Sequence, residues 1–314
     1  MSFIDMHCDT VSVLLEHNKV LAENDLDINL GALRQAGVFC QFFAMYVRLQ
    51  EYSSPRHAFE RVEEMYAVFL REMQANSDAI CFVRCAKELE ANRKNGKISA
   101  FLTVEEGGIC GDDIGQLHKL YDMGVRLITL TWNFENALGY PNADDPDLMS
   151  RGLKPFGIEY VETMNRLGML VDVSHLSDGG FWDVARISTK PFVASHSNSR
   201  AMQGHRRNLT DAQLRALGEK GGVTGINFVP RFLGEDEVGR LERAVEHIRH
   251  IKNVAGIDAL AIGSDFDGFV GQSEVRRTAD LIKIPQALSR AGFTGDEIDK
   301  ICYKNALRVI KDVL

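Results

Sequence analysis

Short, nearly continuous apolar runs alternate with amphipathic segments about eight times along the 314 residues of this chain. A strand that is apolar along its whole length is buried on both faces, which is typical of a parallel sheet covered by helices. Eight alternating units in a chain of this length predict a (β/α)8 TIM barrel of the α/β class. The predicted strands cover residues 3–6, 38–47, 98–104, 125–131, 169–173, 192–195, 222–227 and 260–264.

The segments between these runs have helical periodicity, and several end in Gly, as helix C-termini often do. A doubly wound open sheet is the alternative fold. The glycine-rich phosphate loop that would follow its first strand is absent, because "HCDT" occupies that place. No repeat or Pro-rich linker divides the chain, so we expect one domain over residues 1–314, with a short C-terminal helical tail, "GDEIDKICYKNALRVIKDVL".

The charge balance argues against several classes of partner. A net charge of -8 favours solubility and disfavours an electrostatic interaction with nucleic acid or an anionic membrane. We find no secretion signal and no apolar stretch of membrane-spanning length, so a cytoplasmic location is expected. The six scattered cysteines are expected to be buried thiols, because a zinc site on Cys81 and Cys85 would need two more ligands nearby.

The first apolar run ends in "FIDMHCDT". In an extended segment His7 and Asp9 point to one side and Cys8 to the other, so two potential metal ligands share a face. The alternative is that His7 is a hydrogen-bonded polar residue and that Asp9 caps a helix beginning near Thr10.

Other predicted strands also end in residues that can bind metal. Because active sites of such barrels lie at the C-terminal ends of the strands, these side chains are predicted to converge. They are His7 and Asp9, Glu105 and Glu106, His175, His196, and Asp265 and Asp267. The remaining histidines are predicted to lie on helix surfaces (His17, His57, His118, His247, His250) or in a basic loop (His205).

Imidazoles and carboxylates at one rim suit zinc. The donors are more numerous than one catalytic ion needs, so two Zn2+ ions per chain are expected. Such a pair shares a bridging carboxylate and a water that becomes hydroxide near neutral pH.

The chain resembles the renal, or membrane, dipeptidase family of zinc hydrolases, which are amidohydrolase-type barrels. The resemblance covers nearly the whole chain and is carried, in family order, by "IDMHCDT", "FLTVEEGG", "YDMGVRLITLTWN", "VDVSHLS", "ASHSNSRAMQGHRRN" and "IGSDFDG". It implies that His7 and Asp9 hold one zinc, that His175 and His196 hold the other, and that Glu105 bridges them. It also implies that Asp265 is the acid/base carboxylate and that Arg207 binds the terminal carboxylate of the substrate.

The same resemblance implies that some neighbours of these residues have supporting or structural roles and take no direct part in the reaction. Glu106 is expected to be an exposed or supporting residue, Asp267 to fix a turn, and Arg206 to be a solvated or structural loop residue. Two positions depart from the mammalian members of the family. Trp132 replaces a His that stabilises the oxyanion, so it would contribute shape and one hydrogen bond, and Val229 replaces a Tyr that contacts the substrate.

The expected activity is hydrolysis of small dipeptides, including L-Xaa-D-Xaa, by attack of the metal-bridged hydroxide, with Asp265 transferring the proton to the departing amine. A serine triad at "ASHSNS" is disfavoured because no carboxylate is expected to orient His196. Two alternatives stay open: another amidohydrolase-type activity on a lactone, cyclic amide or N-acyl amino acid, and a non-catalytic relative that binds metal or peptide. The resemblance also suggests a homodimer.

Overall fold

Eight parallel strands close into a barrel in the computed structural model, which describes residues 1–314. The order around the ring is β2-β1-β10-β8-β7-β6-β5-β4, and β4 pairs back to β2. The predicted (β/α)8 fold is therefore confirmed, the open sheet is wrong, and each predicted strand is present. The strands are β1 (Phe3–Asp5), β2 (Val38–Tyr46), β4 (Ile98–Glu105), β5 (Val125–Thr129), β6 (Leu170–Asp172), β7 (Val193–Ala194), β8 (Val223–Ile226) and β10 (Leu260–Ile262).

Three further strands were not predicted. β3 (Ile80–Phe82) pairs with the first residues of β4, and β5 pairs with the later residues of β4. β3 therefore extends the sheet next to β4 without being part of the closed ring. β9 (Val238–Gly239) and β11 (Gln272–Ser273) form a two-stranded ribbon. All three are very short and only partly buried, so they lack the long apolar run that marks the barrel strands.

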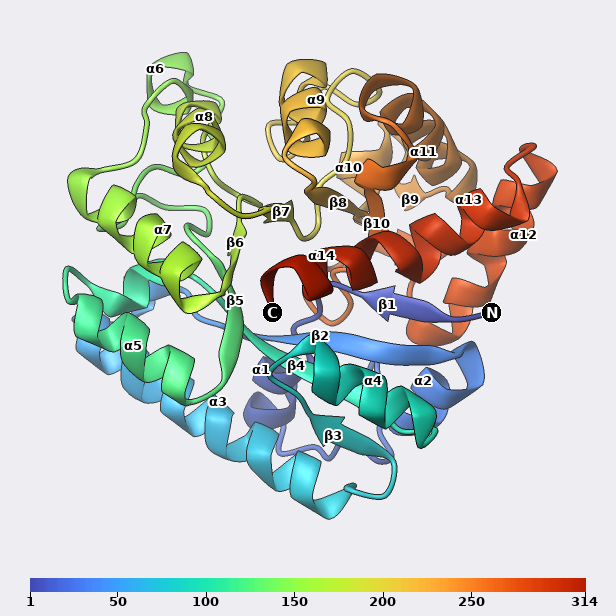
Figure 1. Cartoon of the computed structure of the whole chain (residues 1–314), viewed down its shortest axis with the longest axis horizontal. Helices are drawn as coiled ribbons and strands as arrows, with labels where there is room; N and C mark the ends of the chain where they lie inside the picture. Colours follow the sequence, from blue (N-terminus) through green and yellow to red (C-terminus); the bar gives the residue numbers. More distant parts are fainter.

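Helices surround the ring on its outer side (Figure 1). Local sequence sets several of their ends: Ser54 and Pro55 begin α3, and Thr210 forms a reciprocal capping box with Gln213 at α9. The helices are α1 (Thr10–Glu16), α2 (Leu30–Ala36), α3 (Pro55–Ala75), α4 (Ala86–Lys94), α5 (Ile114–Asp122), α6 (Pro146–Met149), α7 (Pro155–Leu167), α8 (Asp178–Ile187), α9 (Asp211–Glu219), α10 (Pro230–Leu233), α11 (Leu241–Ala255), α12 (Lys283–Arg290), α13 (Gly295–Asp299) and α14 (Asn305–Val313).

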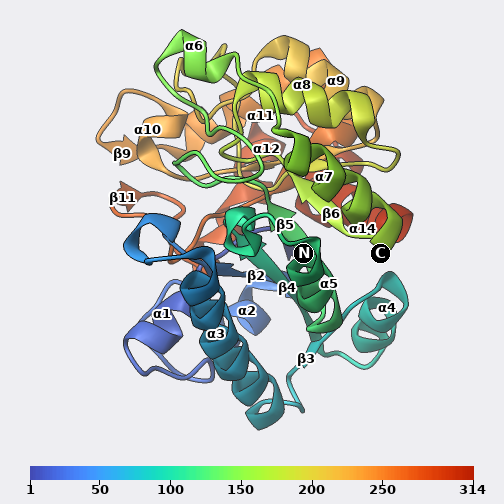
Figure 2. The same cartoon turned by 90° about the vertical axis from the view of Figure 1, so that its left-hand side faces the viewer.

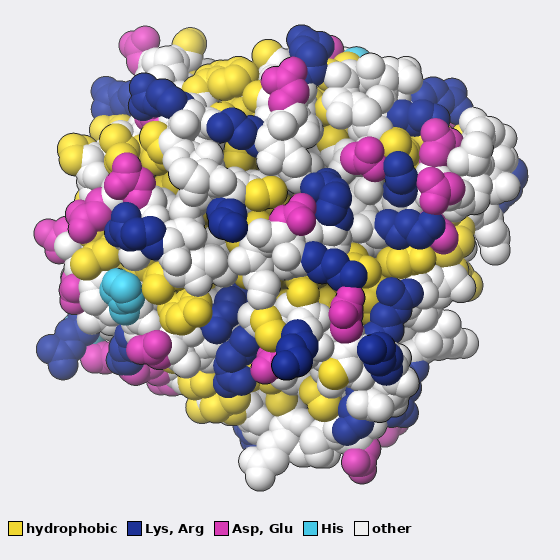
Figure 3. Space-filling model, viewed as in Figure 1, with side chains coloured by type: hydrophobic (Ala, Val, Ile, Leu, Met, Phe, Trp, Pro, Cys, Tyr) yellow, Lys and Arg dark blue, Asp and Glu magenta, His cyan; other side chains and the backbone are white.

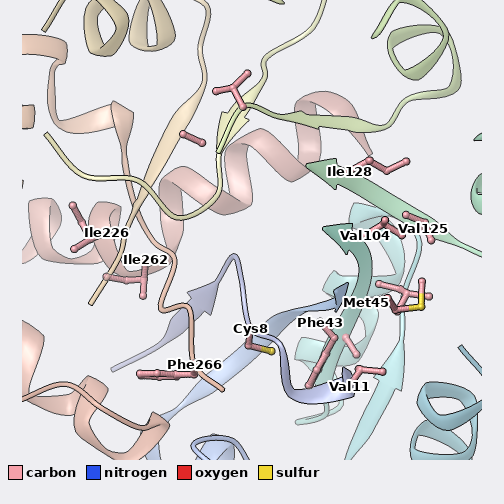
Figure 4. Packing of buried hydrophobic residues seen from close by; sticks show 14 of the residues in the cluster. Cys8, Val11, Phe43, Met45, Val104, Val125, Ile128, Ile226, Ile262 and Phe266 are labelled. Carbon is pink, nitrogen blue, oxygen red and sulfur yellow. The ribbon is translucent and has the colours of Figure 1, made fainter. Parts of the chain in front are cut away.

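The hydrophobic core has two parts, as expected when strands are buried on both faces. The larger cluster of 67 residues packs the strands against the helices, and Figure 4 shows Cys8 in it beside Val11, Phe43 and Phe266. The smaller cluster of 16 residues fills the inside of the barrel, with Phe42 stacked on Phe101.

The C-terminal segment covers the N-terminal end of the barrel. After α13 the chain makes a π-helical turn (Lys300–Lys304) and continues as α14, which crosses the ring of strands in Figure 1. Its residues Ala306, Val309, Ile310 and Val313 belong to the inner cluster. The surface at this end carries Lys and Arg side chains with Asp and Glu between them (Figure 3).

Figure 2 shows this end of the barrel at the right, with α10, β9 and β11 at the opposite end. No helix combines the length and the apolar character needed to cross a bilayer. All six cysteines are free; four are buried, whereas Cys81 and Cys85 are partly exposed.

Replacing Ile310 by Ala tests whether α14 stabilises the barrel. Ile310 is fully buried against the barrel interior, so its truncation is expected to lower the free energy of unfolding by about 2–5 kcal/mol. Urea unfolding followed by circular dichroism measures this change. The control is Lys311→Ala on the exposed face of the same helix, which should change stability little. Equal effects of the two substitutions would contradict this role of α14.

Candidate active site

The ends of β1 and β10 lie side by side, and this brings His7, Asp9 and Asp265 together. The backbone N–H of Asp265 donates to the carbonyl of His7 over 3.2 Å, and that of Asp9 donates to the carbonyl of Phe266 over 2.9 Å. Cys8 pairs with Phe266 and turns its thiol outward to the carbonyl of Phe42. His7 and Asp9 therefore share one side, as predicted, with His7 Nε2 3.5 Å from Asp9 Oδ2.

Glu105, the last residue of β4, lies at the centre of the cluster. Its Oε2 is 3.4 Å from Nε2 of His7. Its Oε1 is 3.0 Å from Nε2 of His175 and 3.5 Å from Nε2 of His196. The two oxygens of one carboxylate thus face different imidazoles, which is the arrangement that a bridging ligand needs.

His175 and His196 present their Nε2 atoms to each other at 3.0 Å. The Nδ1 of His175 donates to Oδ1 of Asn133, and the Nδ1 of His196 lies 2.8 Å from the hydroxyl of Ser195. With their protons on Nδ1, both Nε2 atoms carry lone pairs, which face each other and the Glu105 carboxylate. This crowding of acceptors suits a cation.

Two observations support a metal at this cluster. Both ring nitrogens of His7 and Oδ1 of Asp9 are buried without a hydrogen-bond partner. Two sets of donors lie close enough to hold an ion: His7, Glu105 and His196, and His7, Asp9 and Asp265. Buried nitrogen and oxygen donors of this kind suit Zn2+.

Burial and neighbouring charges shift the pKa values in this cluster. Burial alone would lower the pKa of His7, but the carboxylates of Glu105 and Asp9 outweigh burial and hold it well above its usual value. Burial lowers the pKa values of His175 and His196 well below the usual value, which favours the neutral form of both imidazoles. Burial raises the pKa of Glu105 to about 7.

The backbone is strained around the cluster. Four of the five non-glycine residues with positive φ lie in it or next to it: Glu106 (113°), His175 (67°), Asp265 (62°) and Asp267 (64°). Such conformations persist where surrounding contacts enforce them, and they gather at functional sites.

Asp265 is held by a neighbouring strand. Its Oδ2 accepts a hydrogen bond of 2.9 Å from Nδ2 of Asn227, while Oδ1 lies 3.9 Å from Nε2 of His7. Burial raises the pKa of Asp265. Gly268 packs against the same group, and a Cβ at this position would overlap the carboxylate of Asp9.

A cavity of about 660 Å³ opens above the cluster. Asp9, Glu105, His175 and Asp265 reach it from the barrel. Apolar and aromatic side chains form part of its walls. They are Tyr46, Trp132, Val229, Pro230 and Phe232. Arg231 and the acidic residues Glu16, Asp236 and Glu237 also line it.

Trp132 is among the residues that line this cavity, and its ring centroid lies 6.3 Å from that of His175. Arg207 is not among the lining residues, and its guanidinium carbon lies 5.4 Å from the ring centroid of Phe232, which does line the cavity. Arg207 is buried and has no carboxylate within 4 Å. Its NH1 and NH2 donate to Ser197 Oγ and the His196 carbonyl, and its Nε has no partner. Burial lowers the pKa of Arg207 to about 10.

The supporting residues differ partly from expectation. Asp267 fixes its turn, since it accepts hydrogen bonds from the Thr10 hydroxyl and the Asp27 N–H. Arg206 is exposed and pairs with Asp144. Glu106 is buried, not exposed, and accepts hydrogen bonds from the N–H groups of Gly108 and Trp132 and from the side chain of Asn136, so it is a supporting residue.

Two expectations about histidines were wrong. His247 is buried on the inner face of α11, where its nitrogens bond to the Ser199 N–H and the Leu233 carbonyl. Because both nitrogens find partners, the ring can occupy an apolar helix face. A carboxylate also orients His196, through Ser195: the Ser195 hydroxyl donates to Asp172 over 2.5 Å. The Ser195 proton points to Asp172 and away from His196. In a serine triad the serine hydroxyl would instead donate to the histidine, so these groups do not form one.

Several site residues were not predicted: Tyr46, Asn133, Asp172, Asn227 and Arg231. Tyr46, Asn133 and Arg231 line the cavity, and nothing in the local sequence marks them. Asp172 did give a signal, because a charged residue inside the apolar run "MLVDV" needs buried hydrogen-bond partners.

Comparison with known proteins places this architecture in one family. The family model for membrane dipeptidase, peptidase family M19, matches residues 1–314. An uncharacterized dipeptidase of Schizosaccharomyces pombe is 32% identical, over 98% of this chain and 79% of its own.

Two solved structures are also similar. A dipeptidase AC, a metallo peptidase of family M19, is 26% identical with a TM-score of 0.93, over 100% of this chain and 98% of its own. A metallo peptidase from Rhodobacter sphaeroides, liganded with a phosphinate mimic of the dipeptide L-Ala-D-Ala, is 25% identical with a TM-score of 0.91, over 100% and 99%. The chain therefore belongs to the membrane dipeptidase family, peptidase family M19.

Proposed function

We propose that this protein is a binuclear zinc dipeptidase that hydrolyses small dipeptides, including L-Xaa-D-Xaa. The observation that carries the proposal is the position of Glu105, whose two carboxylate oxygens face His7 on one side and His175 with His196 on the other. Membership of a metallopeptidase family supports the same conclusion.

In this proposal His7 and Asp9 would hold one zinc, His175 and His196 would hold the other, and Glu105 would serve as a ligand between them. The unpartnered nitrogens of His7 and the unpartnered Oδ1 of Asp9 support this assignment. When bound, the two cations would activate a water as the nucleophile and polarise the scissile carbonyl.

Asp265 is proposed to move the proton. Asn227 holds its Oδ2, which leaves Oδ1 directed toward the cluster. The raised pKa of the buried Asp265 suits a carboxylate that takes a proton from the attacking water and delivers it to the departing amine.

Arg207 is proposed to bind the substrate's terminal carboxylate. A buried guanidinium without a carboxylate in contact is costly, and a carboxylate ligand would supply that contact through paired hydrogen bonds. Placed close to the cluster through its contact with the His196 carbonyl, such an anchor selects dipeptides over longer peptides. Trp132 would shape the wall beside His175.

The stereochemical part of the proposal has separate support. The similar Rhodobacter sphaeroides structure holds a mimic of L-Ala-D-Ala, a dipeptide with a D-residue at its C-terminus. A different amidohydrolase-type activity is disfavoured because the bridging position is a glutamate of β4 and not the carbamylated lysine that such relatives often use.

Metal removal tests the centre. Dialysis against a chelator is expected to abolish dipeptide hydrolysis, and Zn2+ should restore it with two ions bound per chain, measured by elemental analysis. His7→Ala should bind fewer than two zinc ions per chain, because the substitution removes a proposed metal ligand beside Glu105. Full activity of verified metal-free protein would contradict the proposal.

A substrate panel tests the reaction. Purified zinc-loaded protein is expected to hydrolyse L,L and L,D dipeptides and to leave tripeptides, lactones and N-acyl amino acids unchanged, as followed by chromatography of substrates and products. Hydrolysis of lactones or N-acyl amino acids alone would favour the other amidohydrolase activity. Peptide binding without any turnover would favour a non-catalytic relative.

Arg207→Ala tests the carboxylate anchor. Loss of a hydrogen bond to a charged group costs roughly 1.5–3 kcal/mol, so kcat/KM should fall about 10- to 100-fold, mainly through KM. The zinc content should stay unchanged. The matched control is Arg206→Ala, since this adjacent arginine is exposed and pairs with Asp144. Unchanged KM for Arg207→Ala would remove the anchor from the proposal.

A further inference from the structure

His196 is connected to a buried carboxylate by one hydroxyl group. Its Nδ1 lies 2.8 Å from Oγ of Ser195, and the same Oγ lies 2.5 Å from Oδ2 of Asp172. All three residues are fully buried. These groups come from the ends of two neighbouring barrel strands, since Asp172 ends β6 and Ser195 follows β7.

The bonds to Asp172 set the direction of this relay. Its Oδ1 accepts from the backbone N–H groups of Ser174 and Ser195, and its Oδ2 accepts from the hydroxyls of Thr129 and Ser195. In each of these four hydrogen bonds an oxygen of Asp172 is the acceptor, so Asp172 donates to none of these partners. The single proton of the Ser195 hydroxyl therefore points to Asp172, and toward His196 the hydroxyl can only accept.

The consequence for the imidazole is one defined tautomer. Nδ1 of His196 must carry the proton, so Nε2 carries the lone pair and faces Oε1 of Glu105 at 3.5 Å. The backbone N–H of His196 also donates to Oγ of Ser174, which fixes the residue at a second point.

A second buried Asp–Ser pair shows what is particular to this relay. At the end of β1, Asp5 accepts hydrogen bonds from both the N–H and the hydroxyl of Ser264, as Asp172 does from Ser195. Ser264, however, makes no hydrogen bond to an imidazole ring, and both nitrogens of His7 lack a hydrogen-bond partner. The Asp5–Ser264 pair thus joins two strand ends without a hydrogen bond to a histidine. The bond from Ser195 to His196 is therefore not needed merely to join β6 and β7.

We propose that Asp172 and Ser195 are positioning residues that hold His196 in the Nδ1–H tautomer, so that its Nε2 is ready to bind a cation. This inference rests on the proposed metal centre. Hydrogen-bond partners of this kind orient the ligand and raise its basicity, and their loss commonly lowers metal affinity about 10- to 100-fold.

The test uses Ser195→Ala and Asp172→Asn in the full chain. Metal-free protein is titrated with Zn2+ against a chromophoric chelator, which resolves the affinity of each ion. We expect one affinity to fall about 10- to 100-fold and the other to stay unchanged. Asp172→Asn should have the larger effect, because its amide can donate to the Ser195 hydroxyl and redirect that proton to Nδ1 of His196.

Thr129→Val is the matched control. It removes a hydrogen bond to the same oxygen of Asp172 without touching His196. Its free energy of unfolding should decrease, while both zinc affinities stay as in the wild type. The tautomer itself is measured in metal-free protein by the 15N NMR chemical shifts of the His196 ring. These shifts should report a protonated Nδ1 in the wild type and in Thr129→Val, but not in Ser195→Ala or Asp172→Asn.

The outcomes separate this inference from the proposed function. If the wild-type protein binds no zinc, the metal centre itself is wrong. If it binds two ions and Ser195→Ala binds them equally well, the positioning role is wrong and the centre stands. An equal loss of affinity in Thr129→Val would also overturn the role. If Asp172→Asn does not fold, Ser195→Ala decides alone.

Discussion

The rim of this barrel is organised around one electrostatic constraint, the burial of several lone-pair donors around Glu105. Nε2 of His175 and His196 and both oxygens of Glu105 lie within a few ångströms of one another. Bringing such groups together out of water costs free energy unless a cation or proton lies between them. The cluster of donors therefore favours the binding of a metal cation.

The surrounding structure keeps these donors in place by hydrogen bonds from outside the cluster. Asn133 holds His175, Ser195 holds His196, and Asn227 holds Asp265. The positive φ values of His175 and Asp265 are maintained by these contacts and by the paired strand ends beneath them. Each contact comes from a different strand end or loop, so closure of the barrel is what brings them to one place.

Much of this could be predicted from the sequence, for identifiable reasons. The eight barrel strands are nearly continuous apolar runs, so they were predicted correctly. The candidate metal-binding residues follow these runs directly, and the structure brings their side chains together as predicted. β3 was missed because it has only three residues, two of them partly exposed. His247 was misplaced because two distant groups, Ser199 and Leu233, satisfy its nitrogens. The contact of Arg207 with Phe232 and the link from Asp172 to His196 depend on three-dimensional contacts that no local pattern encodes.

The ring order has a consequence for how the molecule is made. β1 lies between β2 and β10, so this strand gains its second neighbour only after residue 262 has been synthesised. His7 likewise meets Asp265 only at that stage. Vectorial synthesis therefore leaves the nascent barrel open along the seam between β1 and β10 until β10 has been made.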